Sequence, residues 1–204
     1  MRNTTPSDGY SHPRLDVDAG TGRIAGARRV DSPNCDDRPA NTSIDLVVVH
    51  GISLPPGEFG GPWIDALFTN TLPADAHEYF AGLRSLKVSA HALIRRNGEV
   101  VQYVDLNRRA WHAGQSHWRG RANCNDFSIG FELEGTDTIP YETAQYVVLA
   151  RLIAACCRAY ATLTPDQVTG HSDVAPGRKS DPGIAFDWPL LRALLRFELE
   201  VTPR

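Results

Sequence analysis

Two histidines and one aspartate occupy positions where a metal ion could bind. His50 follows the apolar segment IDLVVV, His171 lies in the turn-rich segment GHSD, and Asp181 comes ten residues later in RKSDPG. A catalytic zinc ion needs three protein ligands and one open position for water, and two imidazoles with a carboxylate supply the ligands. The spacing alone is unspecific, because there is no HExxH pattern. The alternative for His50 is a buried histidine bonded to a carbonyl group.

Glu132 and Lys179 could supply the proton transfer and the positive charge that such a reaction needs. Glu132 stands in the alternating segment FSIGFELEG, on the face opposite its apolar side chains. Partial burial would raise the pKa of Glu132 toward a useful range. Since Glu134 shares this face, the alternative is that the face is simply exposed to solvent. Lys179 precedes Asp181 by two residues, so in an extended segment both side chains point the same way.

The segments around these residues predict one central sheet flanked by helices. A buried strand is expected at 44–49, ending in His50-Gly51, and an alternating strand begins at Phe127. The dipeptide Asn97-Gly98 between two apolar runs predicts a hairpin with a type I′ turn. Helices are expected at 63–68, 75–86, 141–160 and after Asp187, and a loop at 52–62. This order indicates an α/β (α+β) single domain with a mixed sheet.

Composition and charge exclude several classes of protein. The chain has 204 residues and a formal charge of −3, which argues against a nucleic-acid binder that neutralises many phosphates. No apolar stretch approaches the roughly 18–20 residues of a membrane span, and no secretion signal opens the chain. We therefore expect a cytoplasmic protein with reduced cysteines and no membrane partner. The polar residues 1–22 predict a disordered extension, which leaves 23–204 as the folded domain.

Several motifs together resemble those of a known family, the AmpD-type anhydromuramyl-L-alanine amidases. The resemblance covers about residues 26–195, and the motifs follow in the family's order: VVVHGISLPPGEFGGPWIDALF, SAHALIRRNGEVVQYV, RAWHAGQS, CNDFSIGFELEGTDT, YETAQY and GHSDVAPGRKSDPGIAFDW. These enzymes share a fold with peptidoglycan recognition proteins and phage lysozyme-amidases. The resemblance therefore implies the recognition-protein fold for this chain.

The resemblance also implies a function. The implied function is that of a zinc-dependent hydrolase in cytoplasmic cell-wall recycling. Such a hydrolase cuts the amide between the lactyl group of anhydro-N-acetylmuramic acid and the L-alanine of the stem peptide. The family's zinc ligands fall on His50, His171 and Asp181, its catalytic glutamate on Glu132, and the lysine of its K-x-DPG motif on Lys179. An anhydromuropeptide is then the expected substrate, and we expect a monomer.

Other residues are candidates for holding the substrate. His112, in the segment WHAG, is expected to contact the substrate or a zinc ligand, with a structural histidine in a tight turn as the alternative. The loop 55–61, Arg119 and Arg121 are expected to contribute to the substrate surface. The alternative for the two arginines is that they are ordinary solvated charges.

The chain departs from the family pattern at four positions. Gly51 stands where the usual residue is Asn, and Ser172 where it is Cys. Lys87 and Asn123 stand where close relatives tend to carry Arg, which bears on how the carboxylates of the stem peptide are held. None of these positions is a proposed zinc ligand.

Three other functions compete with the recycling amidase. A non-catalytic muropeptide-binding module could share the fold, but such a binder can lose the metal carboxylate, and this chain retains Asp181 and Lys179. An amidase acting on intact peptidoglycan outside the cytoplasm is the second rival, against which the missing export signal counts. Without the resemblance, a generic zinc peptidase would be a third.

Overall fold

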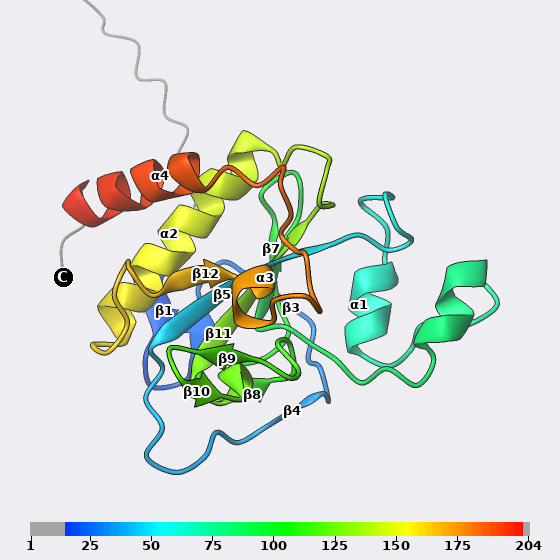
Figure 1. The fold of residues 1–204 in the computed structure, drawn as a ribbon, viewed down its shortest axis with the longest axis horizontal. Coiled ribbons are helices and arrows are strands. Elements are labelled where there is room, and N and C mark those ends of the chain that lie inside the picture. Colours follow the sequence, from blue (N-terminus) through cyan, green and yellow to red (C-terminus); the bar gives the residue numbers. More distant parts are fainter. Residues whose placement is uncertain (1–14, 202–204) are drawn as a thin grey trace, which may run out of the picture.

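A six-stranded mixed sheet forms the centre of the computed structural model, which describes residues 15–201 (Figure 1). Its strands lie in the order β12-β5-β11-β6-β7-β3, with β12 (Val168–Gly170), β5 (Leu46–Ile52), β11 (Ser128–Glu134), β6 (Ala92–Ile94), β7 (Val100–Gln102) and β3 (Arg28–Arg29). The first four strands in this order are parallel, whereas β7 runs antiparallel to β6. The prediction of an α/β domain with a mixed sheet is confirmed.

The two longest helices cover one face of the sheet. Figure 1 shows α2 (Thr143–Ala159) and α4 (Trp188–Val201) side by side. Apolar side chains of both helices share one core cluster with Val47 and Val49 of β5 and with Ile129, Phe131 and Leu133 of β11. Because side chains alternate along a strand, Val48, His50 and Glu132 must point to the opposite face. That face is where the polar chemistry lies.

Shorter elements surround the other face and the edges of the sheet. They comprise two α-helices, two 3₁₀ helices and three two-stranded ladders: α1 (Trp63–Phe68), α3 (His171–Val174), η1 (Glu78–Leu83), η2 (Cys124–Asp126), β1 (Val17–Asp18) with β2 (Arg23–Ile24), β4 (Cys35–Asp36) with β8 (Arg109–Ala110), and β9 (His117–Trp118) with β10 (Arg121–Ala122). The loop expected at 52–62 lies between β5 and α1, except that Ile52 still belongs to the strand. Among the helices of residues 15–201, none is both long and apolar enough to cross a membrane.

The helix predictions hold closely for three segments and fail in part for the fourth. Helices α1, α2 and α4 match the segments predicted at 63–68, at 141–160 and after Asp187. The helix predicted at 75–86 is instead the shorter 3₁₀ helix η1, preceded by turns. Within it only Phe80 is buried, so this segment lacks the apolar stripe that stabilises a longer α-helix.

The hairpin between β6 and β7 has a different turn from the one predicted. The Arg95 N–H donates to the Glu99 carbonyl at 2.9 Å, and the Gly98 N–H donates to the Arg95 carbonyl at 2.9 Å. Gly98 has a φ of 86°, whereas Asn97 is not among the described residues with positive φ. A type I′ turn needs positive φ at both central residues, so the loop is a three-residue turn closed by a glycine bulge.

The folded domain begins earlier than the sequence suggested. Val17 pairs with Ile24 in the β1–β2 ladder, and the Leu15 side chain is buried in the core shared with α2. For residues 15–22 the prediction of a disordered extension is therefore wrong, because two apolar side chains and a backbone ladder fix this segment. The remainder of the predicted extension, residues 1–14, lies outside the described residues.

Candidate active site

Three side chains converge near the carboxyl ends of β5 and β12, and one of them, Asp181, comes from the loop that follows α3. The His50 Nδ1 lies 2.9 Å from the His171 Nδ1 and 3.2 Å from the Asp181 Oδ2, and the His171 Nδ1 lies 3.0 Å from the same oxygen. Within residues 15–201 this is the one group of three or more His, Cys, Asp or Glu side chains close enough to share an ion. The structure thus brings together the three residues predicted as metal ligands.

The donor set fits zinc. Two imidazole nitrogens and one carboxylate oxygen match the ligands of catalytic zinc sites, and tetrahedral ligands about 2.0–2.1 Å from the ion would lie roughly 3.3 Å apart. The observed separations of 2.9–3.2 Å are close to this value. His50 is 1% exposed and His171 is 4% exposed, so neither imidazole is a surface group that meets the other by chance.

The sheet and one short helix position these ligands. His50 lies inside β5 and not at its end as predicted, because β5 continues to Ile52 in parallel register with β11. His171 follows β12 directly and begins α3, where the Asp173 carboxylate accepts the Gly170 N–H at 2.9 Å. The Ser172 N–H donates to the Asp181 carbonyl at 2.9 Å, which joins the two ligand segments.

The ionisation of the cluster follows from its burial and contacts. Burial lowers the pKa of His50 to about 4, against the opposing effect of its close contact with the Asp181 carboxylate. Burial alone would raise the pKa of Asp181, but the adjacent imidazoles of His171 and His50 hold it well below its usual range. A neutral imidazole beside an ionised carboxylate is the state that binds a divalent metal.

Glu132 stands beside His50 on the neighbouring strand, because the two residues are paired in the register of β11 and β5. It is 9% exposed, and its Oε2 is buried without a hydrogen-bond partner among the described residues. Burial and the charge of Asp181 raise its pKa well above the usual value, and Lys179 opposes this shift. The alternative of a solvent-exposed face is therefore wrong: Glu134 is also buried.

A cavity of about 760 Å³ opens over this cluster. Its lining includes His50, His171, Asp181, Glu132 and Lys179 together with His112, and three segments close its sides: the 51–57 loop, the 86–89 segment and residues 135–137. This volume suits a ligand of several hundred daltons. Only the first part of the predicted substrate loop takes part, since Pro56 and Gly57 line the cavity and residues 58–61 do not.

Lys179 lines the cavity with two further cations, Lys87 and Arg178. Arg178 donates to the carbonyl groups of Ala113 and Gln115 and forms no ion pair with a carboxylate in the described part of the chain. The sequence reasoning missed Arg178, although its position next to Lys179 was a signal. Of the two positions where relatives tend to carry Arg, Lys87 lines the cavity, whereas Asn123 does not and adopts a left-handed turn with φ 58°.

His112 lies directly behind the ligand cluster. Its Nδ1 is 2.9 Å from the His50 Nε2, its ring is buried, and one side of it lines the cavity. The structure therefore places His112 within reach of a proposed ligand, which is the first of the two alternatives drawn from the sequence.

Arg119 and Arg121 lie away from the cavity, contrary to the prediction that they hold substrate. Arg121, on β10, forms an ion pair with Asp45 at 2.6 Å and stacks on the Phe127 ring at 3.7 Å. Arg119 has positive φ in the β9–β10 turn and stacks over Trp118 at 5.4 Å. The Arg121 guanidinium is held by its local partners, and both arginines are exposed outside the cavity lining, so the alternative of ordinary surface charges describes them better.

Gly51 leaves room for an aromatic side chain beside the ligands. A Cβ at this position would overlap the Tyr141 hydroxyl, which donates to the Pro182 carbonyl at 2.9 Å. Tyr141 thus contacts Pro182, the residue next to Asp181, through the space that the missing Gly51 side chain leaves. The Gly51 departure opens no gap at the site.

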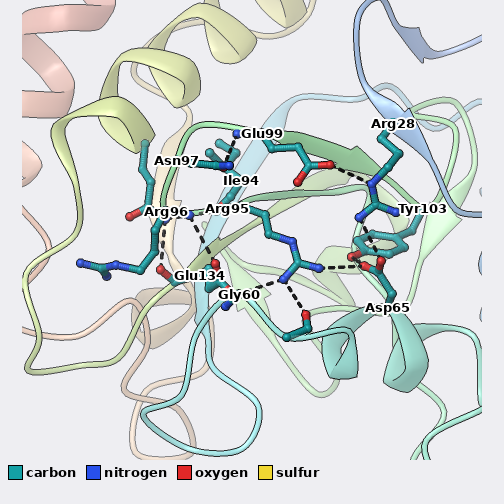
Figure 2. A network of polar contacts seen from close by, with 12 residues as sticks. Arg28, Gly60, Asp65, Ile94, Arg95, Arg96, Asn97, Glu99, Tyr103 and Glu134 are labelled. Carbon is teal, nitrogen blue, oxygen red and sulfur yellow. Dashed lines mark hydrogen bonds and ion pairs between the residues drawn. The ribbon is translucent and has the colours of Figure 1, made fainter.

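A buried ion pair anchors the loop that forms one wall of the cavity. Figure 2 shows Glu134 accepting from the Gly60 N–H at 2.6 Å and from the Arg95 guanidinium at 3.2 Å. Arg95 also donates to the Gly61 carbonyl at 2.9 Å and pairs with Asp65 of α1 at 3.4 Å. The 53–62 loop is therefore fixed to the end of β11 and to α1.

Comparison with known proteins agrees with this geometry. The N-acetylmuramoyl-L-alanine amidase family matches residues 40–184. The 1,6-anhydro-N-acetylmuramyl-L-alanine amidase AmpD of Salmonella typhimurium is 59% identical over 174 residues, which cover 85% of this chain and 92% of that protein.

Solved structures show the same fold. A crystal structure of an AmpD selenomethionine derivative superposes with a TM-score of 0.84 at 57% identity, covering 88% of this chain and 98% of that one. A complex of Escherichia coli AmiD with the substrate anhydro-N-acetylmuramic acid-L-Ala-D-gamma-Glu-L-Lys superposes with a TM-score of 0.53 at 30% identity, covering 77% of this chain and 60% of that one.

Proposed function

This chain belongs to the N-acetylmuramoyl-L-alanine amidase family, and on that premise we propose that it hydrolyses 1,6-anhydro-N-acetylmuramyl peptides with a zinc ion at His50, His171 and Asp181. The bond cut is the amide between the lactyl group of the sugar and the L-alanine of the stem peptide. One observation carries the proposal: a zinc-type donor set lies beside a buried carboxyl group in a cavity of suitable size.

Zinc bound by these three residues would polarise the scissile carbonyl and make water a nucleophile near neutral pH. The remaining steps belong to the chain's own residues. Glu132 accepts a proton as the water oxygen attacks the carbonyl carbon. Lys179 stabilises the negative charge that develops on the carbonyl oxygen. Glu132 then gives its proton to the alanine nitrogen as the C–N bond breaks, which leaves a lactyl carboxylate and a free amino group.

The environment of Glu132 supports both of its proton transfers. Burial favours its neutral form and the Lys179 charge favours its ionised form, so the carboxyl group is placed between opposing influences. A group held in this way can take up and release a proton within one reaction cycle. A non-catalytic binding module would have no need of this arrangement.

The substrate assignment is supported by the cations around the cavity. Lys87, Arg178 and Lys179 line it and form no ion pair with a carboxylate within residues 15–201. A stem peptide carries carboxylates that could reach these cations, and they supply local attraction despite the overall charge of −3.

The decisive experiment presents the zinc-loaded chain with two substrates. Anhydromuropeptides and intact sacculi are incubated separately, and mass spectrometry detects release of the stem peptide. We expect release from the anhydromuropeptides. Release from sacculi alone would replace the proposal with an amidase of the intact wall.

Metal content is measured on the same preparations. The parent chain is expected to bind one zinc ion, and Asp181→Ala is expected to lose it. Full zinc stoichiometry in Asp181→Ala would show that the ligand assignment is wrong.

A further inference from the structure

In each proposed ligand histidine, Nδ1 faces the ligand cluster and Nε2 contacts another residue. The two residues contacted, His112 and Ala113, are consecutive in the sequence. The His50 Nε2 lies 2.9 Å from the His112 Nδ1, and the His171 Nε2 lies 3.2 Å from the Ala113 carbonyl oxygen. The segment 112–113 therefore contacts both imidazoles on the side away from Asp181. These contacts lie outside the cluster of three ligand atoms, although one side of His112 also lines the cavity.

Behind His112 the contacts continue into the sheet. The His112 Nε2 lies 3.1 Å from the Ser128 Oγ, which lies 2.5 Å from the Cys124 carbonyl oxygen. Ser128 and His112 are both buried, and no other hydrogen-bond partner is found for the His112 ring nitrogens among the described residues. A chain of hydrogen bonds thus leads from His50 through His112 and Ser128 to a backbone carbonyl.

The Cys124 carbonyl at the end of this series of hydrogen bonds determines which atom donates and which accepts in each bond. A carbonyl oxygen only accepts, so the Ser128 hydroxyl donates to Cys124 and its oxygen is left to accept from the His112 Nε2–H. A neutral imidazole with hydrogen on Nε2 has a lone pair on Nδ1. The His112 Nδ1 therefore accepts from the His50 Nε2–H, and the lone pair of the His50 Nδ1 is left facing His171 and Asp181.

The Ala113 carbonyl imposes the same arrangement on His171. Because this oxygen accepts from the His171 Nε2–H, the lone pair of the His171 Nδ1 also faces the cluster. Two imidazole lone pairs 2.9 Å apart repel each other, and a shared cation removes that repulsion. These contacts thus hold both imidazoles as the tautomer whose Nδ1 lone pair can bind a metal.

The sequence makes specific room for this arrangement. Gly130, two residues after Ser128 on the same face of β11, lies against the His112 ring, and a Cβ there would overlap the ring. The Asn125 side-chain oxygen accepts from the N–H groups of His112 and Ala113 at 3.2 and 2.7 Å. The position of the segment 112–113 is therefore fixed from both sides.

We propose that His112 and Ser128 are positioning residues that fix the tautomer and orientation of His50, and that the Ala113 carbonyl does the same for His171. This inference rests on the proposed zinc site and assigns neither residue a contact with substrate. Partners of this kind hold the ligand ring in place before the metal arrives, and their loss typically weakens metal binding roughly 10- to 100-fold.

The test measures zinc affinity by competition with a chromophoric chelator, using the full chain and no substrate. Ser128→Ala removes only the hydroxyl that orients His112, and we expect zinc affinity to fall roughly 10-fold. Ser116→Ala is the matched control, because it removes another buried hydroxyl that contacts Cys124 but not His112. Its zinc affinity is expected to stay within about twofold of the parent.

Substitutions of His112 separate hydrogen bonding from packing. His112→Asn keeps an acceptor oxygen near the position of Nδ1 and is expected to retain most of the affinity. His112→Phe keeps a ring and no acceptor, and is expected to bind zinc at least about 10-fold more weakly than His112→Asn. Equal affinities in the two variants would overturn the proposal, because packing alone would then explain the role of the ring.

A spectroscopic measurement reports the tautomer without any variant. In the zinc-loaded parent, ¹⁵N NMR of the histidine rings is expected to show hydrogen on the Nε2 of His112. Hydrogen on its Nδ1 would overturn the proposal, since that atom could not then accept from His50. If the parent itself binds no zinc, the proposed function fails; if the parent binds zinc and Ser128→Ala binds it equally well, only this inference fails.

Discussion

Glu132 shows how position changes the chemistry of a single side chain. Its carboxyl group sits between a buried sheet face and the cavity, and its pKa is raised by burial first and by the Asp181 charge second. The positive charge of Lys179 opposes this shift and lowers the pKa of Glu132. The reactivity of this carboxyl group therefore depends on the cations placed next to it.

Glu132→Gln separates proton transfer from folding. The amide cannot accept the proton, so we expect kcat to fall roughly 10²- to 10⁴-fold with zinc stoichiometry unchanged. Because burial opposes the charged form of Glu132, the neutral amide should not lower the thermal midpoint of the metal-free chain. Steady-state kinetics, metal analysis and thermal denaturation check the three statements, and undiminished turnover would remove Glu132 as the base.

Lys179→Met tests stabilisation of the developing negative charge. The side chain lines the cavity and the substitution preserves most of its length. An interaction made mainly in the transition state affects kcat more than KM, and we expect a loss of roughly 10²- to 10³-fold in kcat. An effect confined to KM would instead indicate that Lys179 only binds substrate.

At the scale of elements, the 53–62 loop depends on contacts made by residues that do not line the cavity over the ligand cluster. The pair of Arg95 and Glu134 is buried, and it anchors Gly60 and Gly61 behind the part of the loop that lines the cavity (Figure 2). Its outer end continues through Asp65 to Arg28 and Glu99, which are half-exposed or nearly so. The network thus joins the cavity wall to α1 and to the β6–β7 hairpin.

Glu134→Gln is expected to loosen this wall. Glu134→Gln leaves the buried Arg95 charge with only its longer pair to Asp65 and its bond to the Gly61 carbonyl, so the free energy of unfolding should fall, by at most about 3–5 kcal/mol. We expect KM to rise because the loop loses its anchor, while zinc affinity stays unchanged. Urea denaturation and steady-state kinetics measure the two effects.

Glu99→Gln supplies the control at the exposed end of the same network. A solvent-screened pair contributes about 0–1 kcal/mol, so this variant should resemble the parent in both stability and KM. If Glu134→Gln lowered stability without raising KM, the loop would have to be held by other contacts.

At the scale of the molecule, one face of the sheet is apolar and the other contains buried histidines. His91 is enclosed behind the site, where its Nδ1 accepts from the Gly130 N–H at 2.9 Å and its Nε2 donates to the Arg108 carbonyl at 3.0 Å. Burial, and then the charge of Arg38, lower the pKa of His91 to about 3. His50 is likewise held neutral, with its pKa lowered by burial to about 4.

These histidines make stability depend on pH in a predictable direction. Above pH 6.5 they are neutral in both the folded and the unfolded chain and contribute no pH dependence. Below pH 6.5 these histidines bind protons in the unfolded chain but not in the folded chain. The free energy of unfolding therefore falls with decreasing pH until about pH 3–4. Each such histidine contributes a slope of about 1.4 kcal/mol per pH unit.

Urea denaturation of the metal-free chain at several pH values between 7 and 4 measures this slope. His91→Gln should reduce this slope, since it removes one buried histidine of lowered pKa and leaves His50 and His112. Glu132→Gln removes the opposite contribution of the Glu132 carboxyl group, whose pKa is raised by burial. In that variant, a free energy of unfolding that stays flat from pH 6.5 to 4.5 would contradict the neutral, buried state of the His50 and His91 imidazoles.

The sequence by itself determined most of the secondary structure and named the candidate reactive groups. Strand and helix periods are local properties of the chain, so β5, β11, α2 and α4 could be read with errors of only a few residues. The motifs around His50, His171 and Asp181 predicted three side chains that the fold brings close enough to share an ion, and the order of the motifs named the family. The location in the cell, the monomeric state and the individual roles of the site residues remain predictions.

Only the tertiary structure decided which side chains share an environment. His50 and His171 are 121 positions apart, and their separation of 2.9 Å depends on the parallel pairing of β12 with β5. Packing buried Glu132, placed His112 and Ser128 behind the ligands, and left Arg119 and Arg121 outside the cavity. Burial and long-range contacts arise from the whole fold, so the local pattern left two alternatives for Glu132 and for His112, and the packing decided between them.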